Sequence, residues 1–246
     1  MGPGGAKSAA ARIPTGIAIT ARPGDQEVQS GAPWGSIGGV LVTPITRAAL
    51  AAEVVELVAA RPHRVRLVLD GPAPTRPDQL AQEVATALRA LGRATIVVDA
   101  ADFLRPASVR LELGRTDADA LLDRWLDEPA LRREVLDPAE PGASGKVLAR
   151  LWDTRSDRAY REGYTTLPDD GVVLLHGALL LGRGLPVDLA VHLRMGAAAL
   201  GRALPDDLRW TLPAHARYEA EHSPSTEADL LVLADHPDRP AVQRAG

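Results

Sequence analysis

Hydrophobic positions along this chain follow two alternating patterns. Short β-like runs are rich in Val, Leu and Ile, and several are apolar on both faces, as strands covered by helices should be. Segments with apolar residues at helical spacing separate most of these runs. The alternation predicts an α/β fold, a three-layer sandwich around a mainly parallel five-stranded sheet. The expected strands cover residues 65–70, 94–100, 171–177, 187–193 and 228–234.

The expected helices have recognisable ends. Residues 46–60 form an amphipathic pattern that begins with Thr46 as an N-cap candidate. Residues 77–91 start with proline at a suitable first helical position and stop before a glycine. The pattern over 117–136 predicts one or two further helices divided near Pro129, and residues 213–222 predict another.

The N-terminal residues 1–36 are rich in Gly, Ala, Pro and Ser and predict a flexible tail, although "TGIAIT" could form a short strand. Residues 37–246 are expected to form a single domain. No apolar run is long enough to span a bilayer, and the N-terminus lacks the apolar segment of a signal peptide. We therefore expect a cytoplasmic protein without a membrane partner.

Composition removes several function classes. The net charge of -4 gives no basic surface for nucleic acid, so no nucleic-acid partner is expected. The absence of cysteine excludes disulfides, thiol catalysis and cysteine-based metal sites. No pair of histidines has a spacing typical of a metal site, so no metal ligand is assigned. Lysine occurs only at positions 7 and 146, so a phosphate site would depend on arginine or backbone amides.

The segment after the strand at 65–70 lies where a phosphate-binding loop would be. A P-loop requires G-x-x-x-x-G-K-[ST], in which backbone N–H groups surround the phosphates and the lysine reaches the terminal ones. Here Gly71 is followed by "PAPTRPDQ", whose three prolines lack an N–H. Arg76 replaces the second glycine, Pro77 the lysine and Asp78 the hydroxyl residue. Two readings stay open: a capped turn without a ligand, or a weakened anion site that uses Arg76.

A second glycine-rich stretch, "EPGASGKVL" at 140–148, resembles a P-loop only superficially, because a helical pattern precedes it rather than a strand. We expect a flexible loop there, with a ligand contact through Lys146 as the alternative.

Taken in order, several segments between about residues 60 and 240 resemble the uridine kinase branch of the P-loop kinases, particularly its divergent bacterial members. "VRLVLDG" resembles the opening strand, "VVDAADFLRPASVRLELGRTDADAL" the substrate segment, "LRREVLDPAEPGASGKV" the glycine-loop stretch, and "GVVLLHGALLLGRGLPVDLAVHL" the strands that lead into the lid. The resemblance implies a P-loop nucleoside kinase fold with a lid near 194–218. It also implies ATP and Mg²⁺ as cofactors and phosphoryl transfer to a nucleoside or another small hydroxylated molecule.

Candidate site residues follow from the positions of these segments. Asp102, where a strand opens into a loop, is the expected base, and His176 the expected proton shuttle; a turn-forming aspartate and a core histidine are the alternatives. The residues expected to contact phosphate or nucleotide are Asp70, Gly71, Arg76, Arg194 and Arg202. Those expected to contact the substrate are Phe103, Arg105, Arg115 and Tyr218.

The chain departs from the kinase pattern in three places. The phosphate loop has a degenerate Walker A sequence, the usual acidic position falls on Ala101 beside Asp102, and His176 stands where Asp is common. Three functions therefore remain open. One is a nucleoside kinase-like phosphotransferase, and a second is a catalytically inactive pseudokinase or small-molecule-binding protein. A third is a repurposed enzyme that uses Asp102 and His176 as an acid–base pair.

Overall fold

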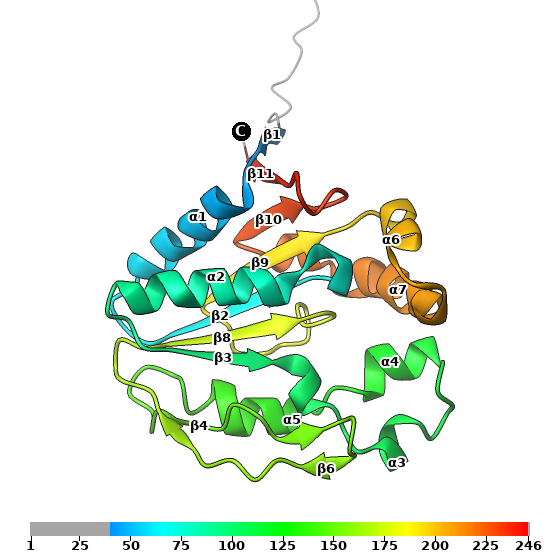
Figure 1. Cartoon of the computed structure of the whole chain (residues 1–246), viewed down its shortest axis with the longest axis horizontal. Coiled ribbons are helices and arrows are strands. Elements are labelled where there is room, and N and C mark those ends of the chain that lie inside the picture. Colours follow the sequence, from blue (N-terminus) through cyan, green and yellow to red (C-terminus); the bar gives the residue numbers. More distant parts are fainter. Residues whose placement is uncertain (1–39, 246) are drawn as a thin grey trace, which may run out of the picture. The chain divides into compact units, whose positions relative to one another are not determined.

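The computed structural model describes residues 40–245, and its centre is a seven-stranded sheet in the order β1-β11-β10-β9-β2-β8-β3 (Figure 1). The tail expected at 1–36, with its possible short strand, lies outside the described residues. All five predicted strands are present and pair in parallel with their neighbours. They are β2 (Val65–Asp70), β3 (Thr95–Asp99), β8 (Val172–Gly177), β9 (Leu189–Arg194) and β10 (Leu230–Leu233).

The sheet is wider than predicted, because two antiparallel strands extend it beyond β10. These are β1 (Val40–Pro44) and β11 (Ala241–Ala245), which pair with each other, while β11 also pairs with β10. The prediction of five strands was therefore two strands short. Leu41 and Val42 of β1 are exposed, and β11 carries the polar residues Gln243 and Arg244, so neither segment has the apolar pattern of a buried strand.

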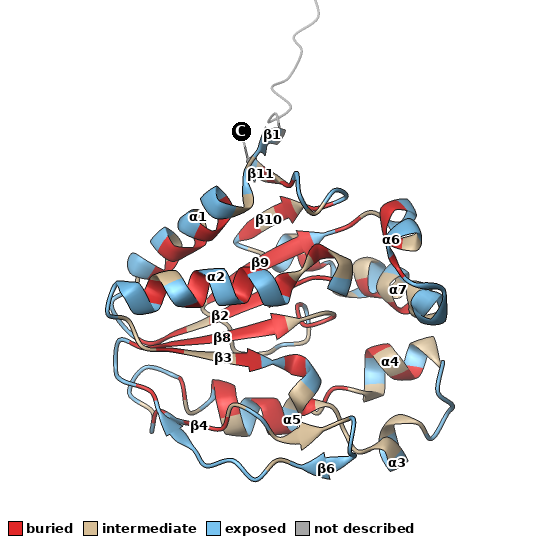
Figure 2. Cartoon of the chain, viewed as in Figure 1, coloured by how far each residue is buried: buried red, intermediate tan, exposed pale blue. Residues whose placement is uncertain are grey.

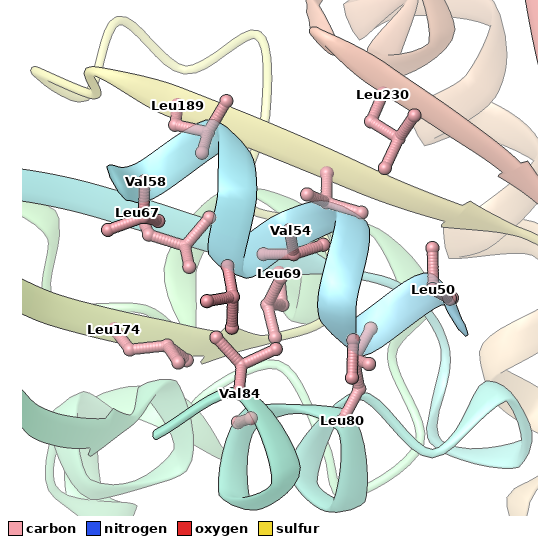
Figure 3. Close-up of a cluster of buried hydrophobic side chains, with 14 of the residues drawn as sticks. Leu50, Val54, Val58, Leu67, Leu69, Leu80, Val84, Leu174, Leu189 and Leu230 are labelled. Atoms are coloured by element: carbon pink, nitrogen blue, oxygen red, sulfur yellow. The ribbon is translucent and has the colours of Figure 1, made fainter. Parts of the chain in front are cut away.

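Helices cover both faces of the sheet, which confirms the predicted α/β class. On one face lie α1 (Arg47–Ala59) and α2 (Pro77–Ala90), whose apolar sides pack on β2, β8, β9 and β10 (Figure 3). Thr46 caps α1 as predicted, since its side chain accepts a hydrogen bond from the Ala49 amide at 3.2 Å. Pro77 occupies the first turn of α2. Figure 2 shows the central strands buried between the layers.

The opposite face is covered by shorter elements. α4 (Ala118–Arg124), α5 (Glu128–Leu131), the π-helical turn η3 (Arg132–Leu136) and α7 (Leu212–His222) contribute its buried core. The predicted division near Pro129 is present, because Asp127 caps α5 by accepting from the Ala130 amide at 3.1 Å. Two small antiparallel pairs precede β8: β4 (Lys146–Val147) with β7 (Thr165–Thr166), and β5 (Trp152–Asp153) with β6 (Arg158–Ala159).

Parallel pairing brings the carboxyl ends of β9, β2, β8 and β3 to one edge of the sheet. In Figure 1 the arrowheads of β3, β8 and β9 point towards the side where α6 (Ala197–Ala203) and α7 lie. Short elements leave this edge: the 3₁₀ turns η1 (Ala73–Thr75) after β2, η2 (Ala100–Phe103) after β3 and η4 (Asp206–Thr211) after α6. The remaining helices are α3 (Ala107–Arg110) and α8 (Pro224–Glu227).

Ligands of open parallel sheets bind outside the carboxyl ends of the strands, so this edge is the place to look for a site. Among the helices of residues 40–245, none combines the length and apolar character needed to cross a membrane.

Candidate functional site

The loop that follows β2 is held by two hydrogen bonds of its own and by one to the end of β8. The amides of Gly71, Thr75 and Arg76 donate to backbone carbonyls at 2.8–2.9 Å. The prolines at 72, 74 and 77 have no N–H to donate. Of the described residues 71–77, only Ala73 keeps an amide without a backbone acceptor. The Asp78 and Gln79 amides at the start of α2 also have no backbone acceptor, so the main-chain donors that this segment leaves for an anion are those of Ala73, Asp78 and Gln79.

The side chain of Thr75 occupies space inside this loop. Thr75 is 3% exposed, and its Oγ1 donates to the Pro72 carbonyl at 2.8 Å. A Cβ on Gly71 would lie 2.7 Å from Thr75 Oγ1 and 2.8 Å from Cβ of Leu193. Gly71 therefore allows the loop to pack tightly against β9, which is a structural reason for the glycine.

Arg76 adopts the left-handed backbone conformation, with φ 57°, at the position of the second P-loop glycine. Its guanidinium forms an ion pair with Asp238, between β10 and β11, and its carbonyl accepts from Arg47 Nη2 at 3.0 Å. The side chain is thus already paired with a carboxylate. Phosphate binding by Arg76 stays a prediction, and it requires that the Asp238 pair opens.

Asp70, the last residue of β2, is completely buried and fully engaged by the protein. Its Oδ1 accepts from the Leu180 amide at 2.9 Å. Its Oδ2 accepts from the Tyr218 hydroxyl at 3.0 Å and lies 2.7 Å from His192 Nδ1. Asp70 thereby ties β2 to β9, α7 and the loop after β8. A contact of Asp70 with a phosphate or metal stays a prediction, and such a ligand would compete with these three partners.

His192 continues this network to the surface. It is 1% exposed, and its Nε2 lies 3.2 Å from Glu219 Oε1. Burial by itself would lower the pKa of His192, but the hydrogen bonds with Asp70 and Glu219 raise it to about 9. The hydrogen bond from His192 in turn lowers the pKa of Glu219. The imidazole is therefore protonated at neutral pH, between two carboxylates.

Tyr218, expected at the substrate, belongs to the same network, and its contact with a substrate stays a prediction. Its hydroxyl donates to Asp70 and accepts from the Leu181 amide at 2.8 Å. Burial, and then the charge of Asp70, raise the pKa of Tyr218. The hydroxyl has no donor or lone pair aimed at a substrate.

Above the network lies a cavity of about 540 Å³, which we call the α7 cavity. It separates the ends of β2 and β9 from α6 and α7, and Arg194 contributes to its wall at 3.6 Å from Glu219 Oε2. His215 also lines it, and burial lowers the pKa of His215. The polar lining is Asp70, His192, Arg194, His215, Tyr218 and Glu219, and the apolar lining includes Leu179, Met195, Leu200, Leu212 and Pro213.

A second hollow, of about 630 Å³, lies beside the ends of β3 and β8; we call it the β3 cleft. Asp102 and His176 both line it, so the structure brings these two predicted residues together. Asp99 is the cross-strand partner of His176, and its Oδ1 accepts from the Ala101 amide at 2.8 Å. The turn-forming aspartate at this strand end is therefore Asp99, which leaves Asp102 facing the cleft.

The electrostatics of the β3 cleft are dominated by carboxylates. Asp102 Oδ2 accepts from Arg150 Nε at 3.1 Å, and Asp78, Glu83 and Asp99 also line the cleft. Burial raises the pKa of Asp102, against the hydrogen bonds from Tyr160 and Arg150, which lower it. In the part of the chain that the structure describes, no group of three His, Asp or Glu residues could hold a metal ion.

A third hollow, of about 280 Å³, lies among the loops after β2, β3 and β8, α4 and η4; we call it the tryptophan cavity. Trp125 lines it and packs on Trp210 with ring centroids 5.6 Å apart. The buried Trp125 Nε1 has no hydrogen-bond partner among the described residues. Asp99 lines both this cavity and the β3 cleft, so the two spaces share a wall.

Other predicted site residues lie away from these spaces. Phe103 is completely buried in the hydrophobic core and lines none of the three cavities, so its assignment to the substrate is corrected. Arg105 is half-buried, and Arg115 and Arg202 are exposed, outside all three linings. Arg150, Trp125, His215 and Glu219 were not predicted. Arg150 and Glu219 lie in segments whose sequence patterns indicate only ordinary surface.

The glycine-rich stretch at 140–148 lies at the opposite edge of the sheet. Carbonyl groups from this region converge on the buried Arg64, which donates to Ala143 at 2.7 Å and to Pro168 at 3.0 Å. A Cβ on Gly145 would lie 2.6 Å from the Leu167 carbonyl. The loop thus presents acceptors to a cation, the reverse of a phosphate-binding loop, and Lys146 is exposed.

Comparison with known proteins identifies the fold. A scan of protein-family models finds no match, and neither does a search of curated proteins. Solved structures do match, with 36 similar chains. One is a protein named a possible uridine kinase from Bacillus stearothermophilus, 17% identical, with a TM-score of 0.61 over 74% of this chain and 96% of that one.

Two further structures agree. A protein provisionally named a fructose transport system kinase, from Silicibacter sp. TM1040, is 24% identical, with a TM-score of 0.52 over 75% of this chain and 90% of that one. The protein YGR205w is 11% identical, with a TM-score of 0.55 over 82% of this chain and 99% of that one. The chain therefore has the fold of the uridine kinase-like P-loop kinases, as its sequence predicted.

Proposed function

We propose that this chain is a cytoplasmic small-molecule-binding protein on a P-loop kinase fold. Its acceptor side, which we define as the β3 cleft with the tryptophan cavity, is kept, whereas its phosphate-donor side, the loop after β2, is closed. The observation that carries the proposal is the hydrogen bonding of the loop after β2. Thr75 and Arg76 donate within the loop and Gly71 donates to Gly177, so Ala73 keeps the one unused amide of residues 71–77, beside those of Asp78 and Gln79 at the start of α2. A nucleoside triphosphate with Mg²⁺ does not fit this donor set.

Opening the loop for a triphosphate would be unfavourable. Each internal hydrogen bond contributes about 1 kcal/mol, so freeing three amides costs about 3 kcal/mol before any phosphate is bound. The Thr75 side chain would also have to leave its buried position. Asp78, in the first turn of α2, adds a negative charge where a phosphate would gain from the helix N-terminus.

The acceptor side has the features of a small-molecule site. The β3 cleft supplies carboxylates that can accept hydrogen bonds from sugar hydroxyls, and the adjoining tryptophan cavity supplies an aromatic wall. A hydroxylated molecule with a planar ring, such as a nucleoside, suits this combination. We propose that residues 194–218 form a lid over this edge, with residues 37–246 as one domain.

Binding measurements test the proposal. In thermal-shift and calorimetric titrations, uridine or another nucleoside should stabilise the protein saturably, whereas ATP with Mg²⁺ should not. Saturable binding of ATP with Mg²⁺ to the natural chain would contradict the proposal. The triple variant Arg76→Gly, Pro77→Lys, Asp78→Ser restores the P-loop residues and serves as the matched control, since it should gain nucleotide affinity if the loop is the obstacle.

A second candidate is kinase-like phosphoryl transfer, with nucleotide held by residues outside the loop. It is favoured by the position of Asp102 in an open cleft, where burial raises its pKa and suits it to take a proton from a hydroxyl. In this case Asp102→Asn should abolish turnover, and near-normal turnover would remove Asp102 as the base. Arg76→Ala should weaken nucleotide binding, and unchanged affinity would reject arginine as the substitute for lysine.

A further inference from the structure

The α7 cavity is separate from the β3 cleft and has a different character. Its volume of about 540 Å³ is within the range of small-molecule sites. It lies between the ends of β2 and β9 on one side and α6 and α7 on the other, and the two lining sets have no residue in common. It does share Leu179 and His215 with the tryptophan cavity.

The charges around the α7 cavity cancel. Asp70 and Glu219 are carboxylates, and the imidazolium of His192 and the guanidinium of Arg194 balance them. The deeper groups are also satisfied: Asp70 has three partners, and both ring nitrogens of His192 face carboxylates. Asp70 and His192, at the base of the cavity, therefore attract neither an anion nor a cation and leave no unsatisfied hydrogen-bonding group for a ligand. A charged ligand would lose its hydration without gaining a counter-charge.

His215 is the exception among the less exposed polar groups of the lining, since Arg194, whose guanidinium also forms no hydrogen bond to a described residue, is exposed and lies 3.6 Å from Glu219 Oε2. His215 is half-buried, and none of the hydrogen bonds formed by the described residues involves its ring. Burial lowers its pKa, so the ring is neutral at pH 7 and can donate through one nitrogen and accept through the other. A ligand with a single hydroxyl or amide would complete the hydrogen bonding of His215.

The remaining wall is apolar. Leu179, Met195, Leu200 and Leu212 contribute side chains to it. We propose that the α7 cavity binds an uncharged small molecule with a mainly apolar body and one hydroxyl or amide group that meets His215. This site shares no residue with the β3 cleft, although Leu179 and His215 also line the tryptophan cavity, so its independence of the proposed function is tested by Asp102→Asn and Ala197→Trp rather than at His215.

Binding of 2-naphthol tests the proposal, because this probe is planar, uncharged at pH 7 and carries one hydroxyl. Saturation-transfer NMR and calorimetry on the full chain should show saturable binding. Naphthalene-2-sulfonate has the same rings with a negative charge, and it should bind at least about tenfold more weakly, which is about 1.4 kcal/mol. Absence of 2-naphthol binding, or equal affinity for the sulfonate, would overturn the proposal.

Matched variants locate the probe. Ala197→Trp should fill the cavity and abolish 2-naphthol binding, since Ala197 lines it and is exposed enough to be replaced without disturbing the core. Ala198→Trp, one residue further along α6 and outside the lining, should leave the affinity unchanged. Equal affinity in these two variants would place the probe elsewhere and refute the assignment.

Measuring both 2-naphthol binding and nucleoside binding in the same variants separates this site from the acceptor side. His215→Phe keeps a ring but removes the hydrogen bond, so it should weaken 2-naphthol about three- to tenfold, the effect of one hydrogen bond. Asp102→Asn should leave 2-naphthol affinity unchanged, and Ala197→Trp should leave nucleoside binding unchanged. Loss of both ligands in Ala197→Trp would contradict the independence of the two sites. If the natural chain binds 2-naphthol but no nucleoside, the α7 site is supported and the proposed function is contradicted.

Discussion

Replacing His192 with Gln should remove a pH dependence of stability that the natural chain has above neutral pH. His192 is buried between the carboxylates of Asp70 and Glu219. Burial alone would lower its pKa, but the hydrogen bonds raise it from an ordinary 6.5 to about 9. Because one pKa unit corresponds to about 1.4 kcal/mol, the folded chain favours the protonated imidazole by about 3 kcal/mol.

This stabilisation has a defined pH window. The pKa is higher in the folded chain, so the contribution is fully present below pH 6.5 and is lost as the pH rises through about 9. Glu219 behaves in the opposite way, because its hydrogen bond from His192 lowers its pKa below the ordinary 4.5. Its contribution is present above pH 4.5 and is lost as the pH falls through the lowered value. The network is therefore fully stabilising between about pH 4.5 and 6.5.

Urea unfolding measures this contribution directly. The free energy of unfolding is determined for the natural chain and for His192→Gln at about pH 6 and about pH 9.5. The difference between the two proteins should shrink by about 3 kcal/mol at the higher pH, since only the natural chain loses a proton from this site. His63→Gln is the control, because His63 is exposed and its replacement should change stability by less than about 0.5 kcal/mol at both pH values.

The reasoning fails if the difference between natural and variant proteins is the same at both pH values. His192 would then be neutral in the folded chain throughout. Glu219→Gln gives an independent check if His192→Gln does not fold. Removing one carboxylate should lower the pKa of His192, so the loss of stability should begin at a lower pH than in the natural chain.

Three other substitutions test the structural reasoning by urea unfolding. Gly71→Ala should destabilise the chain by about 2 kcal/mol, because the new Cβ would lie 2.7 Å from Thr75 Oγ1, whereas Gly163→Ala has no atom within 4 Å and should be nearly neutral. Tyr218→Phe should cost about 1–2 kcal/mol, because it removes a donor from the buried Asp70; an unchanged stability would contradict this. Arg64→Met should cost about 3 kcal/mol and speed amide exchange at Gly145 and Leu167, while no change in exchange would reject the anchoring role.

The sequence predicted the parallel part of the sheet well, for a physical reason. Each of β2, β3, β8, β9 and β10 is a short apolar run, because a strand buried between two layers of helices needs apolar side chains. The two antiparallel strands could not be found in this way, because β1 is exposed and β11 alternates with polar residues. Their pairing depends on partners about 200 residues apart, which local patterns do not encode.

The site was less predictable. Asp102 and His176 were recognised because each stands at the end of an apolar run, and they do share the β3 cleft. The hydrogen-bond network around Asp70 was missed, since its partner His192 is 122 residues away in the chain. A buried ion pair has no local signature. Phe103 was misassigned for the opposite reason, because an aromatic residue next to a predicted site was taken for a ligand contact when it fills the core.

The loop and the buried network lead to one conclusion about how this edge of the sheet is used. A phosphate site at this position needs N–H groups that do not already donate to an acceptor within the protein. Here the amides of Gly71, Thr75 and Arg76 donate to backbone carbonyls, and the Arg76 guanidinium pairs with Asp238. The neighbouring Asp70 binds Tyr218 and His192 in place of water or metal. Polar groups that could serve a triphosphate instead stabilise the fold, which is why we propose that ligands are recognised by the carboxylates and aromatic wall beside β3 and by the neutral α7 cavity.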